Sequence, residues 1–126
     1  MKKLLYIVAA LSLVACSKSI EERAAQESEE YNKKVCPTPY INDCRTDSTS
    51  FDKQTRVYTY YLTLRGKADN AKAIADNKKK LRASQQESLN NNPGLKKYKE
   101  AHFTFRFIFR SAKDPKVVLL DETYKY

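Results

Sequence analysis

A row of alternating phenylalanines constrains the fold of this chain more than any other feature. Every second residue between His102 and Arg110 is aromatic, and the row consists of Phe103, Phe105, Phe107 and Phe109. Alternate side chains of a strand share one face, so this pattern predicts a strand over 102–110. Burial of each ring is worth about 2 kcal/mol, which predicts that the whole row lies in the core.

Three other segments have the composition of strands. Residues 55–65 are rich in β-branched and aromatic side chains with a period of two, and shorter strands are predicted over 45–51 and 116–123. The face of 55–65 that is predicted to be buried carries Tyr58, Tyr60, Leu62 and Leu64. Residues 71–91 have a thin apolar stripe at helical spacing, with Asp69 or Asn70 as the expected N-cap.

The order of these elements predicts a small α+β domain. Its sheet is expected to be antiparallel, with about four strands in the order β-β-α-β-β and with one long helix on the Phe face. Two glycines and no tryptophan in 126 residues argue against a turn-dense β-sandwich. The length allows one compact domain.

The N-terminus has the pattern of an export signal. Lys2 and Lys3 precede a run of twelve uncharged residues from Leu4 to Ala15. A helix of that length rises about 18 Å, which is too short for a hydrocarbon core of about 30 Å. The run is therefore predicted to be a signal segment and is excluded from the fold.

This run ends in Leu13-Val14-Ala15-Cys16, which resembles the lipobox of bacterial lipoproteins. The resemblance implies that signal peptidase II removes residues 1–15 and that Cys16 becomes the acylated N-terminus. Two or three acyl chains anchor a protein stably to a membrane face. Ser17 resembles the residue that lets many such lipoproteins reach the outer membrane, so this location is expected over the inner membrane. The alternative is an ordinary signal peptide with Cys16 near its cleavage site.

Residues 16–34 are predicted to be a lipidated, acidic tether in front of a basic domain that covers 35–126. Ser19 and Glu22 have the spacing of a capping box, so a helix is expected to begin near Ile20. Its apolar residues are too few to bury a face, which favours a partly helical spacer. The alternative is that its acidic residues form a sorting signal, because they resemble surface-export signals of lipoproteins in Bacteroidetes.

Charge separates these two parts of the chain. Residues 17–30 have a net charge of −3, whereas residues 31–126 carry twenty Lys and Arg against ten Asp and Glu, a net charge of +10. Expected partners are therefore anionic: lipid headgroups, envelope glycans or an acidic protein. The alternative is that the charge serves only solubility. Lys78-Lys79-Lys80 is interpreted as a solvated helix face, and no nucleic acid is expected.

Cys36 and Cys44 form an even pair once Cys16 is acylated. An exported chain meets an oxidising compartment, so a disulfide between them is predicted. Closing this loop of nine residues would contribute about 2.5 kcal/mol in the chain-entropy model.

Candidate groups for catalysis are sparse. His102 is the single histidine, and no metal site is expected because too few ligands accompany it. Asp121 and Glu122 are adjacent and would point to opposite faces of a strand, so they cannot form an acid/base pair. There is no glycine-rich phosphate loop. We expect neither an enzyme nor a cofactor.

The sequence favours a non-enzymatic lipoprotein that binds a protein or an anionic envelope component. The open face of the two long strands is expected to display an aromatic and cationic mixture that suits partner binding: Tyr61, Arg65, Arg106 and Arg110. The alternative for these residues is a solvated sheet face. The alternative function is an inhibitor or immunity-type lipoprotein that blocks a toxin, a phage component or a hydrolase.

Overall fold

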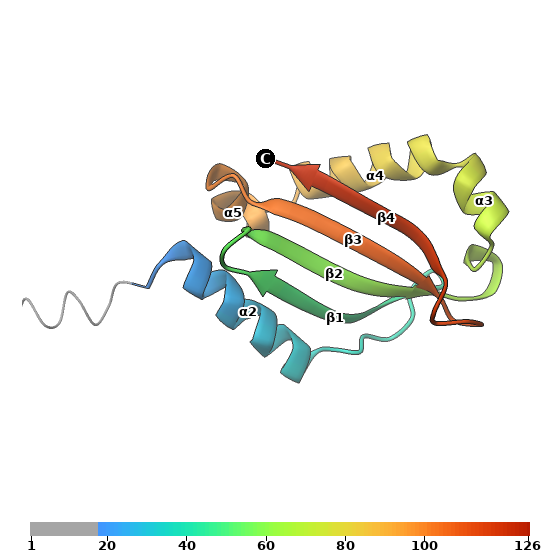
Figure 1. Cartoon of the computed structure of the whole chain (residues 1–126), viewed down its shortest axis with the longest axis horizontal. Helices are drawn as coiled ribbons and strands as arrows, with labels where there is room; N and C mark the ends of the chain where they lie inside the picture. Colours follow the sequence, from blue (N-terminus) through green and yellow to red (C-terminus); the bar gives the residue numbers. More distant parts are fainter. Residues whose placement is uncertain (1–17) are drawn as a thin grey trace, which may run out of the picture.

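The computed structural model describes residues 18–126, so the predicted signal segment and Cys16 lie outside the described residues. The elements are α2 (Ile20–Lys34), β1 (Cys44–Asp52), β2 (Val57–Leu64), η1 (Gly66–Ala68), α3 (Ala71–Asp76), α4 (Lys78–Asn90), η2 (Pro93–Leu95), α5 (Lys96–Glu100), β3 (Thr104–Ser111) and β4 (Val118–Lys125). The prediction of a small α+β domain with four strands is confirmed (Figure 1). No helix within residues 18–126 has both the length and the hydropathy to cross a bilayer.

The sheet is mixed, with the strand order β1-β2-β3-β4. The outer pairs are antiparallel as predicted, but β2 and β3 are parallel, so the prediction of a fully antiparallel sheet is wrong. The cause is the connection between them. Helix α4 runs back along the sheet, and the start of β3 lies beside the start of β2, where Thr104 N donates to Arg56 O at 3.1 Å. A crossover of this kind produces a parallel pair.

The helical stretch predicted over 71–91 is two helices that meet at Asn77. Asn70 is the N-cap of α3 as predicted, with its side chain accepting from Ala73 N at 3.0 Å. Asn77 ends α3, since its side-chain amide donates to Ala73 O at 2.8 Å. Its carbonyl then accepts from Leu81 N and begins α4. One long helix was therefore the wrong prediction, and the break redirects the chain along β4.

Helix α2 begins at the predicted cap, where Ser19 Oγ accepts from Glu22 N at 3.1 Å. It is not a spacer, however. Ala24 is fully buried in the core, and Ser28 Oγ lies 2.8 Å from Thr49 Oγ1 of β1. Because these contacts are mostly polar, hydrophobic periodicity does not reveal them. Helix α2 is part of the packed domain, so the domain boundary predicted at residue 35 moves to the start of this helix.

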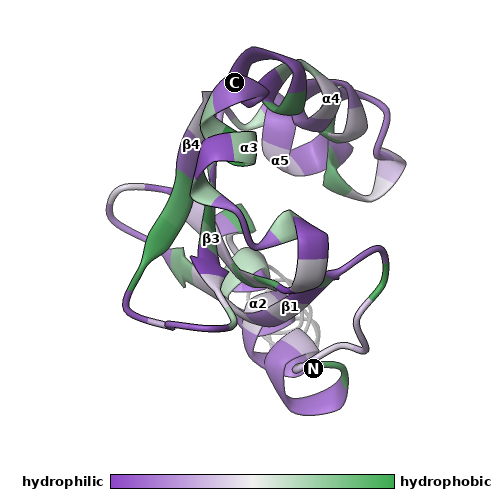
Figure 2. Ribbon diagram, turned by 90° about the vertical axis from the view of Figure 1, so that its right-hand side faces the viewer, coloured by the Kyte–Doolittle hydropathy of each residue, from purple (hydrophilic) through white to green (hydrophobic). Residues whose placement is uncertain are grey.

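The core is an aromatic cluster at the end of the sheet where β2 and β3 begin. It is formed by Ala24, Tyr58, Leu89, Tyr98, Phe103, Phe105 and Tyr124. The predicted Phe row divides here: Phe103 and Phe105 are fully buried, whereas Phe107 and Phe109 are only partly buried. The long helix was expected to cover all four rings. Figure 2 shows why it does not, since α3 and α4 stand at one border of the sheet, with β1 and α2 at the other.

Helix side chains pair with backbone groups of one residue at each edge of the sheet. At the β1 edge, Asn32 Nδ2 donates to Thr49 O at 2.8 Å, and Thr49 N donates to Asn32 Oδ1 at 2.7 Å. At the β4 edge, Arg82 Nη2 donates to Thr123 O at 3.1 Å. These contacts satisfy backbone groups that would otherwise be open to another strand.

Candidate partner-binding groove

An apolar groove lies between the sheet and helices α3 and α4, with a volume of about 720 Å³. Its floor is formed by side chains of β2, β3 and β4, namely Tyr60, Leu64, Phe107, Phe109 and Leu120. Its helical wall consists of Ile74, Leu81, Ser84, Gln85 and Ser88. Asn42 and Cys44 line the opposite side, next to the start of β1, and Leu95 lies at the end near α5. The groove thus lies over the half of the Phe row that no helix covers.

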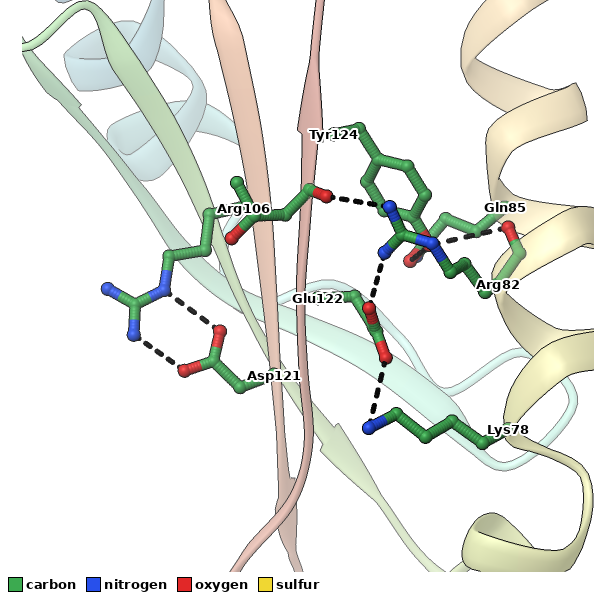
Figure 3. A network of polar contacts seen from close by, with 8 residues as sticks. Lys78, Arg82, Gln85, Arg106, Asp121, Glu122 and Tyr124 are labelled. Carbon is green, nitrogen blue, oxygen red and sulfur yellow. Dashed lines mark hydrogen bonds and ion pairs between the residues drawn. The ribbon is translucent and has the colours of Figure 1, made fainter.

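A polar seam holds α4 against β4 and keeps this groove open. Arg82 Nη1 lies 2.5 Å from Glu122 Oε2, and Lys78 Nζ lies 3.8 Å from Glu122 Oε1 (Figure 3). Tyr124 Oη donates to Gln85 Oε1 at 2.9 Å. Glu122 is almost fully buried, so these contacts compensate its charge. These contacts fix α4 beside β4, so that Leu81, Ser84, Gln85 and Ser88 face the groove.

Among residues 18–126, no charged residue lines the groove itself. A smaller hollow of about 370 Å³ shares Ala68, Ile74, Leu81 and Ser84 with it, and there Lys67 and Lys80 supply the charges. Neither lysine forms an ion pair within the part of the chain that the structure describes. Burial raises the pKa of the Cys44 thiol, and the Asp47 carboxylate adds to the effect, so the thiol facing the groove is protonated at neutral pH.

Cys36 and Cys44 are both free thiols in the structure, so the predicted disulfide is not present. The loop between them is closed by hydrogen bonds instead. Thr38 N donates to Thr46 O at 3.0 Å, and Ile41 and Cys44 exchange backbone hydrogen bonds at 2.9 and 3.1 Å. These contacts take the loop-closing role that the sequence assigned to the cysteines.

The residues predicted to bind a partner lie on the sheet face opposite the groove or at its end. Tyr61, Arg106 and Arg110 share that face, since β2 and β3 pair Tyr61 with Ile108 and Thr63 with Arg110. Arg106 pairs with Asp121 through two contacts of 2.9 and 2.5 Å (Figure 3). Arg65 lies past the end of β2 and stacks on Tyr40, with its guanidinium carbon 3.9 Å from the ring centroid. This surface stays a predicted partner site.

The candidate catalytic groups are not brought together. His102 is exposed and has a left-handed backbone (φ 62°) between α5 and β3. Asp121 and Glu122 point to opposite sides of β4, as predicted, toward Arg106 and Arg82 respectively (Figure 3). Within residues 18–126, no three His, Cys, Asp or Glu side chains are grouped to hold a metal ion.

Sequence reasoning missed the groove, although the sequence contains a signal for it. The stripe of α4 that faces the sheet carries Ser84, Gln85 and Ser88, and small or polar residues on such a stripe do not fill a core. A helix with this stripe cannot cover four phenylalanines, so part of the row had to be left open.

Comparisons with known proteins give a fold and a family. A secreted protein of Pseudomonas aeruginosa has a similar structure, with a TM-score of 0.64 and 14% identity over 86% of this chain and 95% of the other. The pilotin EpsS of the Vibrio vulnificus type 2 secretion system is similar with a TM-score of 0.56 and 13% identity, over 82% of this chain and 84% of the other. No curated protein matches the sequence. A family model matches residues 19–120, most of the described chain, and the protein therefore belongs to the family described as a domain of unknown function, DUF8479.

Proposed function

We propose that this protein is a lipid-anchored protein of the bacterial cell envelope that holds a segment of a protein partner in the apolar groove and catalyses no reaction. The observation that carries the proposal is the groove itself. Phe107 and Phe109 are partly exposed at its floor, although burial of an aromatic ring is among the most favourable contributions to a protein interface.

The chemistry of the lining supports binding rather than catalysis. Apolar side chains and a few uncharged polar groups make up the groove, so it offers no acid, base or cation to a reacting molecule. Cys44 is the one residue of the lining that has a thiol, and its raised pKa makes it a poor nucleophile at neutral pH.

The similarity to a pilotin supports a protein partner in the envelope. Pilotin EpsS belongs to a secretion system, and the other similar structure is a secreted protein. Acylation at Cys16, with the outer membrane as the favoured location, would bring the groove to such a partner.

The anchor is tested on the mature protein purified from the bacterium that makes it. We expect its mass to exceed that of residues 16–126 by two or three acyl chains. We also expect a Cys16→Ala variant to move from the membrane fraction to the soluble fraction. A native mass equal to that of the polypeptide alone would refute the lipid anchor.

The groove is tested by photo-crosslinking in the same cells. A benzoylphenylalanine at Ser84, which lines the groove, is expected to crosslink to one envelope protein, with the crosslinked segment identified by mass spectrometry. The matched control places the same group at Ala83, which is exposed on α4 and does not line the groove. Equal crosslinking from both positions would contradict the proposal. A variant with Arg106→Glu and Arg110→Glu tests the opposite sheet face, and it is expected to leave the Ser84 crosslink intact.

A further inference from the structure

The groove favours one conformation of the segment that it binds. Strand addition beside it is hindered, because Asn32 occupies the backbone groups of Thr49 at the β1 edge and Arg82 occupies the Thr123 carbonyl at the β4 edge, and an added strand would have to displace both contacts. An extended segment would therefore have to lie across the face of the sheet. There it would place its own amide and carbonyl groups against Phe107, Phe109 and Leu120, which offer no hydrogen bonds. Each unpaired backbone group costs on the order of 1–3 kcal/mol.

A helix avoids this cost, since its backbone groups are paired internally. The floor residues Tyr60 and Leu64 lie four positions apart on β2, a span of about 13 Å. This span corresponds to about nine helical residues at 1.5 Å each. A helix of that length presents apolar side chains at positions i, i+3 or i+4, and i+7 toward one face.

Charge defines the flanks of this helix. Residues 65–100 carry ten Lys and Arg against four Asp and Glu, and four of these cations pair with acidic side chains outside the range: Arg65, Lys78, Arg82 and Lys97. Lys67 and Lys80 line the hollow that continues from the groove, and neither has an ion-pair partner among residues 18–126. Acidic residues beside the apolar stripe of the helix would complement these lysines.

We infer that the groove binds an amphipathic α-helix of two to three turns whose apolar stripe packs on Phe107 and Phe109 and whose flanks are acidic. The inference rests on the proposed function and specifies the partner segment. Basic flanks would face Lys67 and Lys80 and are disfavoured by their charge.

The test uses the acylated mature protein, residues 16–126, in detergent and four synthetic peptides of 14 residues. All four peptides contain the same number of leucines. In the first three, the leucines stand at positions i, i+3, i+7 and i+10. The first has glutamate flanks, the second has lysine flanks, the third is the first with two central prolines, and the fourth is the first with its residues scrambled. We expect the first to bind at least ten-fold more tightly than each of the others, as measured by fluorescence anisotropy, and to gain helical circular dichroism on binding.

Two pairs of variants locate the binding. Ser84→Trp is expected to weaken binding of the acidic peptide at least ten-fold, while Ala83→Trp leaves it unchanged. Lys67→Glu with Lys80→Glu is expected to reverse the preference between acidic and basic peptides. Lys72 and Lys79 are exposed but do not line either hollow. The same charge change at these two residues is expected to leave the preference for the acidic peptide unchanged. Thermal unfolding of each variant verifies that it is folded.

Failure of this inference can be told apart from failure of the proposed function. If Ser84 crosslinks to a partner in cells but the proline peptide or the basic peptide binds as well as the acidic one, the amphipathic acidic helix is refuted and the groove function stands. A crosslinked segment that is basic, or whose apolar residues lack helical spacing, would also refute the inference of an acidic amphipathic helix. If Ser84 gives no specific crosslink and no peptide distinguishes Ser84→Trp from Ala83→Trp, the proposed function itself is wrong.

Discussion

Asp69 joins the start of the crossover to the end of β3. Its Oδ2 accepts from Ser111 Oγ at 2.8 Å and from Lys113 N at 3.1 Å. The hydrogen bond from Ser111 is the main reason that the pKa of Asp69 lies below its ordinary value, and the backbone N–H of Lys113 adds to the effect. A carboxyl group with a depressed pKa stabilises the folded state above its unfolded pKa of about 3.9, and that contribution is lost as the pH falls through the folded pKa.

We therefore predict that Asp69→Asn lowers the melting temperature at pH 7 and that its difference from the wild type shrinks below about pH 4. Melting followed by circular dichroism between pH 2.5 and 7 measures this. Glu87→Gln, an exposed change on α4, serves as the control and is expected to be neutral across the range. A difference that stays constant down to pH 2.5 would show that the Asp69 charge contributes nothing.

The pKa values of the two free thiols are raised, whereas the pKa of Asp69 is lowered. Burial raises the pKa of both Cys36 and Cys44, and the negative charge of Asp47 adds to this. Since the thiolate is the reactive form, we predict that iodoacetamide labelling reaches half its maximal rate above the ordinary cysteine pKa of about 8.5. Asp47→Asn is expected to move the labelling profile toward lower pH. The result would be contradicted if labelling required prior reduction or matched a free cysteine at neutral pH.

At the scale of elements, α4 depends on the ion pairs of Glu122. The carboxylate is almost fully buried, whereas the Arg82 side chain is 45% exposed. Without Arg82, the buried Glu122 carboxylate has only the more distant Lys78 as an ion-pair partner. A poorly paired buried charge destabilises the folded state. Solvent around the half-exposed Arg82 side chain reduces this loss of stability.

We predict that Arg82→Met destabilises the protein by about 1–2 kcal/mol and that adding Glu122→Gln restores part of this loss. Urea denaturation of the two single variants and the double variant gives the coupling free energy. Lys79→Met, which removes a charge from the outer side of α4, is the matched control and is expected to change stability by less than about 0.5 kcal/mol. Fully additive effects would mean that the pair does not hold α4.

The elements also show how far the sequence alone could lead. Alternation in 102–110 and 55–65 predicted two central strands because one face of each is buried. The caps at Ser19 and Asn70 were visible because capping uses only neighbouring residues. The parallel central pair was not predictable in this way, since it depends on where α4 places the chain.

The groove was missed for a similar reason. Phe107 and Phe109 have the same local pattern as Phe103 and Phe105, and only the position of α4 distinguishes the open pair from the buried one. That position is set by contacts such as Arg82 with Glu122, which are 40 residues apart in the sequence. The packing of α2 was missed because Ser28 and Asn32, its main contacts with β1, are polar.

At the scale of the whole molecule, the acidic helix and the basic domain form one unit. Glu21 lies 3.2 Å from Arg56, and Glu27 lies 3.1 Å from Lys97 and also accepts from the hydroxyl of Tyr98. The charge separation along the sequence is thus neutralised in part by folding.

We predict that a chain beginning at Val35 loses cooperative unfolding, because Ala24 leaves the aromatic core and Thr49 loses its partners. The free energy lost with several such contacts is large compared with the free energy of unfolding of a typical domain, which is about 5–15 kcal/mol. A chain beginning at Lys18, which keeps the whole of α2 and its cap, is the control and is expected to unfold in one sharp transition by calorimetry. Equally sharp unfolding transitions of the two chains would show that α2 is a spacer and not part of the folded domain.

The contacts of Asn32 with Thr49 and of Arg82 with Thr123 at the sheet borders have a further consequence under the proposed lipid anchor. An anchor holds copies of the protein in one layer, where unprotected edge strands can pair with those of a neighbour and aggregate. With an amide and a guanidinium in those places, crowded copies can stay separate.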